Sequence, residues 1–381
     1  MKSKILILLA IFLTFLVITK TEAECDLEFK SQDYNSSTYN LDYQELKYPR
    51  LSYSKEVKGI YINFWTLSHK EKREKMIERI TESNLNAVVI DLKDTKGYAP
   101  FASSAVTQMP YNISKEEFED LISQWQRNGI YVIGRIAIFK DSNLANVEDD
   151  YALKYLFDDK SKTVTISSER WTNPYVDEVW NYNLNIAEEM VELGLDEIQF
   201  DYIRFPTLSQ KSRLTIKSDG VRSKSDAIIG FLKEAQKRLQ DYNIVLSADL
   251  FGLTTTAKED LGIGQDITKI AQYVDYISPM LYPSHYSQGI YGIENPARSP
   301  YQVISKSLAD AKEKLGPDAN KIRPWLQDFS LSYSYDKEEI KAQIRAVEDQ
   351  KLSSWLLWNP SSRYTIEALI PNSEEEIHDG D

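Results

Sequence analysis

Short runs of β-branched and aromatic residues alternate with longer helix-forming stretches along most of this sequence. The third helical stretch opens with Asn173 as a possible N-cap and Pro174 at the first helical position, where its missing N–H does no harm. Strands that alternate with helices form parallel βαβ units, and eight such units predict a single closed (β/α)8 TIM barrel. The runs that read as strands are 59–65, 87–93, 131–139, 196–205, 244–251, 273–282, 323–329 and 354–359, and the main helical stretches are 70–83, 115–128, 174–193, 224–239, 301–315 and 336–350.

The two ends of the chain differ from the barrel in composition. Lys2 and Lys4 precede an apolar run from Ile5 to Ile18, a pattern typical of a secretory signal. We therefore expect a signal peptide over 1–23, a polar spacer over 24–54, a barrel over 55–370 and an acidic tail over 371–381. The expected location is secreted or cell-envelope associated, on the extracellular side.

Cys25 is the single cysteine of the chain and lies where a bacterial lipoprotein carries its lipid. Glu24 precedes it, whereas lipid attachment favours small residues there. Lipidation of Cys25 and retention of an uncleaved N-terminal segment as a membrane anchor stay open as alternatives. No internal disulfide is possible with one cysteine, so the fold depends on burial.

Charge and histidine content exclude several classes of function. The chain carries 45 Lys and Arg against 58 Asp and Glu, a net charge of −13, which repels the phosphate backbone of nucleic acids. The three histidines, His69, His285 and His378, are far apart, and no HExxH motif is present. We therefore predict no nucleic-acid partner, no metal centre and no cofactor.

Polar and aromatic side chains gather at the carboxyl ends of the expected strands. In a barrel of this kind that rim holds the active site, and long loops at 140–170, 206–223 and 283–300 follow strands on the same side. The candidate substrate-binding residues at or near these ends are Trp65, Asp91, Arg135, Arg204, Tyr282, His285, Asp328, Trp358 and Asn359. Trp325 is a further candidate for stacking on a sugar ring.

Several segments, taken in order, resemble one family of bacterial TIM-barrel proteins classed as glycosyl hydrolases and known mainly as a domain of unknown function. The resemblance covers about residues 55 to 368. It rests on WTNPYVDEVWNYN, LGLDEIQFDYIRFP, VLSADLFG, DYISPMLYPSHY and WLLWNPSS. It implies glycoside hydrolase chemistry, although fold alone does not fix function.

Glycoside hydrolysis normally requires two carboxyl groups. Asp201 and Asp249 occupy equivalent points of the fourth and fifth expected strands, and strand alternation places Gln199 and Asp201 on one face. The sixth strand ends without a carboxylate, which favours Asp249 as the partner of Asp201. Resemblance to retaining enzymes with this barrel implies that Asp201 is the nucleophile, so Asp249 is the expected general acid/base.

Each of these residues also has a structural interpretation. An Asp at a strand end often caps a helix or pairs with an arginine, and Arg204 is either the ion-pair partner of Asp201 or a substrate ligand. A rim histidine such as His285 is often plain polar surface. The expected function is hydrolysis of a polysaccharide or oligosaccharide through Asp201 and Asp249. The alternatives are a non-catalytic carbohydrate-binding barrel at the cell envelope and a barrel acting on a non-sugar substrate.

Overall fold

The computed structural model describes residues 56–102, 106, 113–157, 170–207, 212–215, 220 and 222–370. The expected signal peptide, spacer and acidic tail lie outside these residues, and so does Cys25. In the described part of the chain, no helix combines the length and the apolar character that crossing a bilayer requires.

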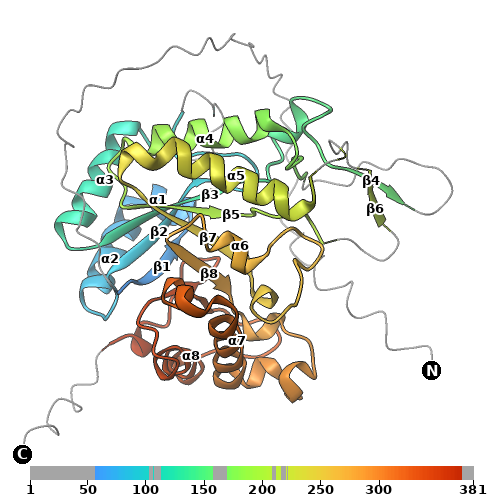
Figure 1. Cartoon of the computed structure of the whole chain (residues 1–381). Helices are drawn as coiled ribbons and strands as arrows, with labels where there is room; N and C mark the ends of the chain where they lie inside the picture. Colours follow the sequence, from blue (N-terminus) through green and yellow to red (C-terminus); the bar gives the residue numbers. More distant parts are fainter. Residues whose placement is uncertain are drawn as a thin grey trace, which may run out of the picture. The chain divides into compact units, whose positions relative to one another are not determined.

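Eight parallel strands close into a barrel, which confirms the predicted fold (Figure 1). Each strand pairs with the next barrel strand along the chain, and the last pairs with the first, as in the register Gly59 to Leu356. The barrel strands are β1 (Lys58–Ile62), β2 (Ala87–Lys93), β3 (Tyr131–Ala137), β5 (Glu197–Asp201), β7 (Val245–Phe251), β8 (Tyr276–Met280), β9 (Trp325–Gln327) and β10 (Trp355–Trp358). Most are shorter than predicted, because the ends of the apolar runs belong to loops.

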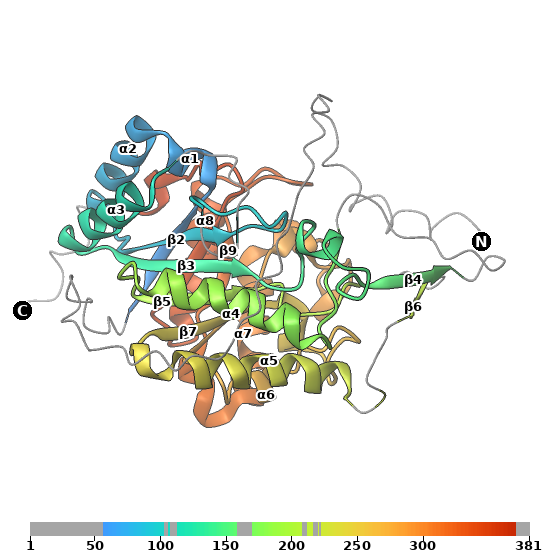
Figure 2. The ribbon, with the colours of Figure 1, turned by 90° about the horizontal axis from the view of Figure 1, so that it is seen from above.

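Helices surround the barrel on its outside (Figures 1 and 2). The helices are α1 (Phe64–Ser68), α2 (Lys70–Thr81), α3 (Lys115–Arg127), α4 (Asp177–Val191), α5 (Lys224–Leu239), α6 (Ile267–Ile270), α7 (Pro300–Leu315) and α8 (Lys337–Asp349). Short 3-10 turns occupy the loops: η1 (Leu144–Asn146), η2 (Gln240–Tyr242), η3 (Gly252–Thr255), η4 (Pro283–His285), η5 (Ile290–Gly292), η6 (Pro296–Arg298), η7 (Gly316–Lys321) and η8 (Ile366–Ala368).

The start of α4 differs from the prediction. The helix begins at Asp177 after Val176, so Asn173 and Pro174 precede it and do not cap it. The Asn173 side chain instead accepts a hydrogen bond from the Tyr175 N–H, 3.1 Å away, within a turn. Asn followed by Pro is as suitable for a turn as for a helix start, so the sequence pattern alone did not distinguish the two.

Two further strands lie outside the barrel. β4 (Lys154–Phe157) follows β3, β6 (Ser212–Thr215) follows β5, and the two pair antiparallel. Figure 2 shows this small sheet away from the barrel strands. Both strands come from loops on the carboxyl side of the barrel, so two neighbouring rim loops are joined to each other.

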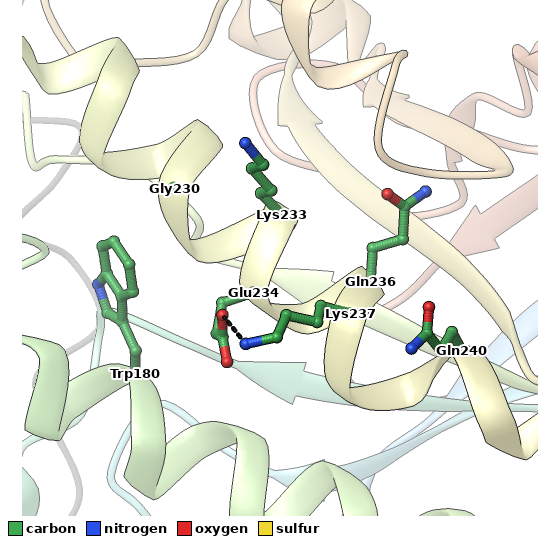
Figure 3. A pocket seen from close by; sticks show the side chains of 7 residues that line it. All are labelled: Trp180, Gly230, Lys233, Glu234, Gln236, Lys237 and Gln240. Carbon is green, nitrogen blue, oxygen red and sulfur yellow. Dashed lines mark hydrogen bonds and ion pairs between the residues drawn. The ribbon is translucent and has the colours of Figure 1, made fainter.

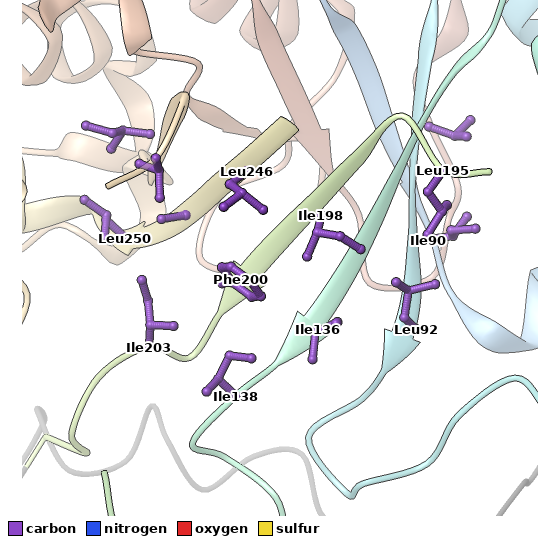
Figure 4. Packing of buried hydrophobic residues seen from close by; sticks show 14 of the residues in the cluster. Ile90, Leu92, Ile136, Ile138, Leu195, Ile198, Phe200, Ile203, Leu246 and Leu250 are labelled. Atoms are coloured by element: carbon purple, nitrogen blue, oxygen red, sulfur yellow. The ribbon is translucent and has the colours of Figure 1, made fainter. Parts of the chain in front are cut away.

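Strand alternation divides the core into an outer and an inner layer. Ile90, Leu92, Phe200 and Leu250 point outward and belong to the large cluster that the helices cover (Figure 4). Residues at alternate positions point into the barrel, where a smaller apolar cluster includes Val89. Charged side chains occupy inward positions near the carboxyl ends of four strands: Asp91, Arg135, Asp201 and Asp249.

Candidate active site

Four charged side chains meet inside the carboxyl end of the barrel. Asp91, Arg135, Asp201 and Asp249 lie on β2, β3, β5 and β7, which are consecutive neighbours in the sheet. Their sequence neighbours pack outward, so the period of two along each strand turns the charged groups inward. All four are buried, with Asp249 only 1% exposed.

Arg135 connects the carboxylates. Its Nη1 donates to Asp91 Oδ1, while its Nη2 and Nε lie 2.5 and 3.0 Å from Asp201 Oδ2. Its Nε is also 3.9 Å from Asp249 Oδ2. One guanidinium therefore faces three buried carboxyl groups, and such a cluster is stable only if part of its negative charge is neutralised by protons.

Both oxygens of Asp201 accept hydrogen bonds from nitrogen donors. Oδ2 accepts from Arg135, and Oδ1 accepts from the backbone N–H of Tyr202 at 2.6 Å. Tyr202 reaches this position with φ at 53°, a left-handed conformation that is costly for a bulky side chain. N–H donors from a side chain and from the backbone therefore fix the orientation of the Asp201 carboxylate.

Asp249 lies in a different environment. Its Oδ1 accepts the indole N–H of Trp325 at 2.7 Å. Burial and the neighbouring Asp201 carboxylate raise the pKa of Asp249 well above its usual value, against the opposing effects of Arg135 and Trp325. Two close carboxyl groups with different environments are the arrangement that separates a general acid from an ionised partner.

Asp91 is the third carboxyl group of the cluster. Its Oδ2 accepts the Tyr61 hydroxyl at 2.5 Å. Burial raises the pKa of Asp91, although Arg135 and the bond from Tyr61 act in the opposite direction. Asp91 and Tyr61 thus hold the side of the guanidinium that faces away from Asp201.

Aromatic rings line the cluster. Trp358 stacks on Tyr61 with ring centroids 4.1 Å apart, and its ring lies 5.3 Å from the Arg135 guanidinium carbon. Tyr282 packs edge-on against Phe329, with centroids 5.5 Å apart. Burial, followed by the carboxylates of Asp249 and Asp201, raises the pKa of Tyr282 well above its usual value.

The sequence left Arg204 open as the ion-pair partner of Asp201 or as a substrate ligand. The ion pair that the structure gives to Asp201 comes from Arg135 on the neighbouring strand. The Arg204 guanidinium lies 4.7 Å from the Trp171 ring and 5.6 Å from the Tyr202 ring, and donates to the Phe205 carbonyl. Arg135 was predicted as a substrate ligand, but its donors are directed at the carboxylates.

Other predicted residues are held within the fold or lie at its surface. Both oxygens of Asp328 accept hydrogen bonds from Thr365, and Asn359 donates to the Asp328 carbonyl. His285 is exposed and packs edge-on against Tyr282. Trp65 is 43% exposed and has the Lys72 ammonium 3.4 Å from its ring centroid.

Three residues that contact the carboxylates were not predicted in these roles: Tyr61, Tyr202 and Trp325. Trp325 was a candidate for stacking on a sugar ring; it is 1% exposed and hydrogen-bonded to Asp249. Strand alternation along β1 points Tyr61 into the barrel beside the cluster, so its place there could be predicted from the strand pattern. The left-handed turn at Tyr202 leaves no such signal in the sequence.

No metal centre coincides with this cluster in the described residues. Among them, no group of three or more His, Cys, Asp and Glu side chains is placed to hold a metal ion. A groove of about 530 Å³ lies instead over the outer helices, lined by Trp180, Gly230, Lys233, Glu234, Gln236, Lys237 and Gln240 (Figure 3). Its lining contains none of the buried charges.

The structure is a closed (β/α)8 barrel with buried carboxyl groups at the carboxyl ends of its strands. Residues 59–364 match the family model described as "Putative glycosyl hydrolase domain", and the chain belongs to this family. A search of curated proteins gave no match.

Solved structures with a similar fold include several glycoside hydrolases. The glycoside hydrolase domain of PgaB (BpsB) from Bordetella bronchiseptica is 12% identical, with 81% of this chain and 95% of that chain covered and a TM-score of 0.61. The endo-β-1,4-mannanase from Thermotoga petrophila is 12% identical, with 84% and 72% covered and a TM-score of 0.53. These identities show a shared fold alone.

A hypothetical protein from Ruminiclostridium thermocellum has a higher sequence identity. It is 30% identical to this chain, with 54% of this chain and 98% of that chain covered and a TM-score of 0.43.

Proposed function

We propose that this protein is a secreted glycoside hydrolase that cleaves a polysaccharide or oligosaccharide, with Asp201 as nucleophile and Asp249 as general acid/base. The observation that carries the proposal is the contrast between the two carboxyl groups. Asp201 has N–H donors on both oxygens, whereas burial and the charge of Asp201 favour the protonated form of Asp249. An ionised carboxylate beside a neutral carboxylic acid is what glycoside cleavage requires.

The separation of the two groups is compatible with a retaining reaction. Asp201 Oδ2 and Asp249 Oδ2 lie 3.0 and 3.9 Å from the same Arg135 nitrogen. The two oxygens are therefore at most about 7 Å apart, compatible with the ~5–5.5 Å of retaining enzymes and below most of the ~6.5–9.5 Å range of inverting enzymes.

In the proposed reaction, Asp249 gives its proton to the glycosidic oxygen while an oxygen of Asp201 attacks the anomeric carbon. The bond to the leaving sugar breaks and a glycosyl ester forms on Asp201. Asp249, now ionised, then takes a proton from water as that water attacks the anomeric carbon, which releases the second product and restores both groups. Arg135 and the Tyr202 N–H hold the Asp201 carboxylate throughout.

Substrate access requires movement of side chains around Asp249. Asp249 is 1% exposed, so a sugar reaches it only when neighbouring residues shift. Tyr282 and Phe329 follow β8 and β9 and pack against each other, and both precede loops at the rim. Rearrangement of rim loops on substrate binding is common among enzymes.

The test is hydrolysis of a broad panel of polysaccharides by the purified full-length protein, beside Asp201→Asn and Asp249→Asn. We expect the parent to release reducing ends and both variants to lose at least about a hundredfold in rate while staying folded. Asp120→Asn, which changes an exposed carboxylate on helix α3 outside the barrel, is the matched control and should retain full activity. Binding by all proteins without cleavage by any would establish a carbohydrate-binding barrel instead.

The proposed location outside the cell rests on the N-terminal sequence alone. N-terminal sequencing of the protein recovered from culture medium and from membranes tests it. A mature chain that begins after Ala23 supports export with cleavage. Recovery of the uncleaved chain in the cytoplasm would overturn it, and membrane-bound chain with a modified Cys25 would establish lipid anchoring.

A further inference from the structure

Trp325 is the residue whose side chain donates a hydrogen bond to the Asp249 carboxyl group. It lies on β9, inside the barrel, with 1% of its surface exposed and its indole nitrogen 2.7 Å from Asp249 Oδ1. Its ring is perpendicular to that of Trp358, with centroids 5.5 Å apart and an interplanar angle of 88°. Packing therefore fixes the direction of the indole N–H.

We propose that Trp325 is a positioning residue that orients the Asp249 carboxyl group and leaves the catalytic proton on Oδ2. An indole N–H can only donate, so Oδ1 must act as acceptor whether or not Asp249 is protonated. The proton of the neutral acid is then carried by Oδ2. This inference rests on the proposed role of Asp249 as general acid.

The position of Oδ2 suits proton donation to a substrate. It lies 3.9 Å from Arg135 Nε, which is beyond hydrogen-bond distance, and it faces the same guanidinium as Asp201. A proton on Oδ2 is therefore directed toward the space between the two carboxyl groups. That space is where the glycosidic bond must lie during the reaction.

Besides the Trp325 indole, three charged groups and one tyrosine influence or adjoin Asp249. Asp201 on β5 raises its pKa, while Arg135 on β3 and Arg323, just before β9, lower it. Tyr282, after β8, is a neutral neighbour because burial raises its own pKa. Trp325 acts on Asp249 through a hydrogen bond. A hydrogen bond donated to an ionised carboxylate stabilises the ionised form, so removal of the indole N–H should raise the pKa of Asp249.

The chain offers a matched pair of variants. Trp325→Phe removes the N–H donor and keeps most of the ring volume. Trp355→Phe makes the same change on the neighbouring strand β10, where the indole nitrogen is buried without a hydrogen-bond partner in the structure. Loss of packing is therefore similar in both variants, whereas only Trp325→Phe removes the bond to Asp249.

The first readout is the pH dependence of kcat/KM on a hydrolysed substrate. The general acid must be protonated, so activity falls as pH rises through the pKa of Asp249. We expect Trp325→Phe to move this basic limb upward by about one pH unit and to lower kcat about tenfold with little change in KM. Trp355→Phe should leave the limb in place. An equal effect of both variants would overturn the proposal.

The second readout needs neither activity nor a variant of Trp325 that folds. The chain has seven tryptophans, so an NMR spectrum of the ¹⁵N-labelled full-length protein shows few indole N–H signals. One of them should shift with pH as Asp249 ionises, and Asp249→Asn, whose amide oxygen still accepts the bond, should abolish that dependence. Trp325→Phe, where it folds, identifies the signal by its loss.

The two readouts separate the two proposals. An indole signal that titrates in a protein without hydrolase activity would support the Trp325 bond and overturn the proposed function. Indole signals that all stay unchanged while the protein remains folded, or that titrate equally in Asp249→Asn, would overturn the role of Trp325 even if the protein is an active hydrolase.

Discussion

At the scale of single residues, Arg135 balances the negative charge of the site. We expect Arg135→Gln to lower the free energy of unfolding at neutral pH by about 3–5 kcal/mol, because it leaves buried carboxylates without their cation. The loss should shrink at acidic pH, where Asp91 and Asp249 are protonated. Urea unfolding at several pH values measures it, with Arg79→Gln on the exposed face of α2 as control. Equal losses for the two variants would contradict this role.

The backbone conformation of Tyr202 also affects stability at the scale of single residues. Its φ of 53° penalises any residue with a Cβ, so Tyr202→Gly should be more stable than Tyr202→Ala by about 1 kcal/mol. At Asp120, an exposed position in helix α3, the order should reverse, with the Ala variant more stable by about 1 kcal/mol. Thermal and urea unfolding of the four variants compare the two sites. The same order at both positions would argue against strain at Tyr202.

At the scale of elements, an ion pair connects the start of the short strand β9 to β5, with β8 and β7 between them in the barrel. Arg323, two residues before β9, forms a fully buried bidentate pair with Glu197 on β5. We expect Arg323→Met to cost about 3–5 kcal/mol, because Glu197 is left charged in the interior. The double variant that also carries Glu197→Gln should recover most of the lost free energy of unfolding. Urea unfolding of the single and double variants measures the coupling, and additive losses would contradict it.

Elements were more predictable than contacts between them. Alternation along each run was enough to place eight strands and to point Asp201 and Asp249 into one barrel, because period two is a property of the strand itself. The Arg135 ion pair joins residues on different strands, and an arginine three residues away looked equally suitable in the sequence. The hydrogen bond from Trp325 depends on the final packing of its ring, which no local pattern records.

At the scale of the whole molecule, the site is expected to lower the stability of the fold at neutral pH. The pKa of Asp249 is higher in the folded chain than in the unfolded one, so the folded state binds an extra proton between these two values. Its contribution is neutral below about pH 4, where both states are protonated, and becomes unfavourable as pH rises. Under the proposed function, the general acid thus costs stability in the pH range where its proton is needed.

Asp249→Asn tests this cost directly, because an amide resembles the neutral acid and still accepts the Trp325 N–H through its oxygen. We expect the variant to be more stable than the parent at neutral pH, by about 1.4 kcal/mol for each unit by which the folded pKa exceeds the unfolded one. The difference should vanish below about pH 4. Urea unfolding across a pH series measures it, beside Glu74→Gln at an exposed helix position, which should change little. A buried carboxyl group with a raised pKa destabilises the fold when it is charged, so replacing it with a neutral amide should stabilise the protein. A variant that is less stable than the parent at every pH would therefore contradict the proposed role. That result would show that Asp249 is a structural ion-pair partner of Arg135.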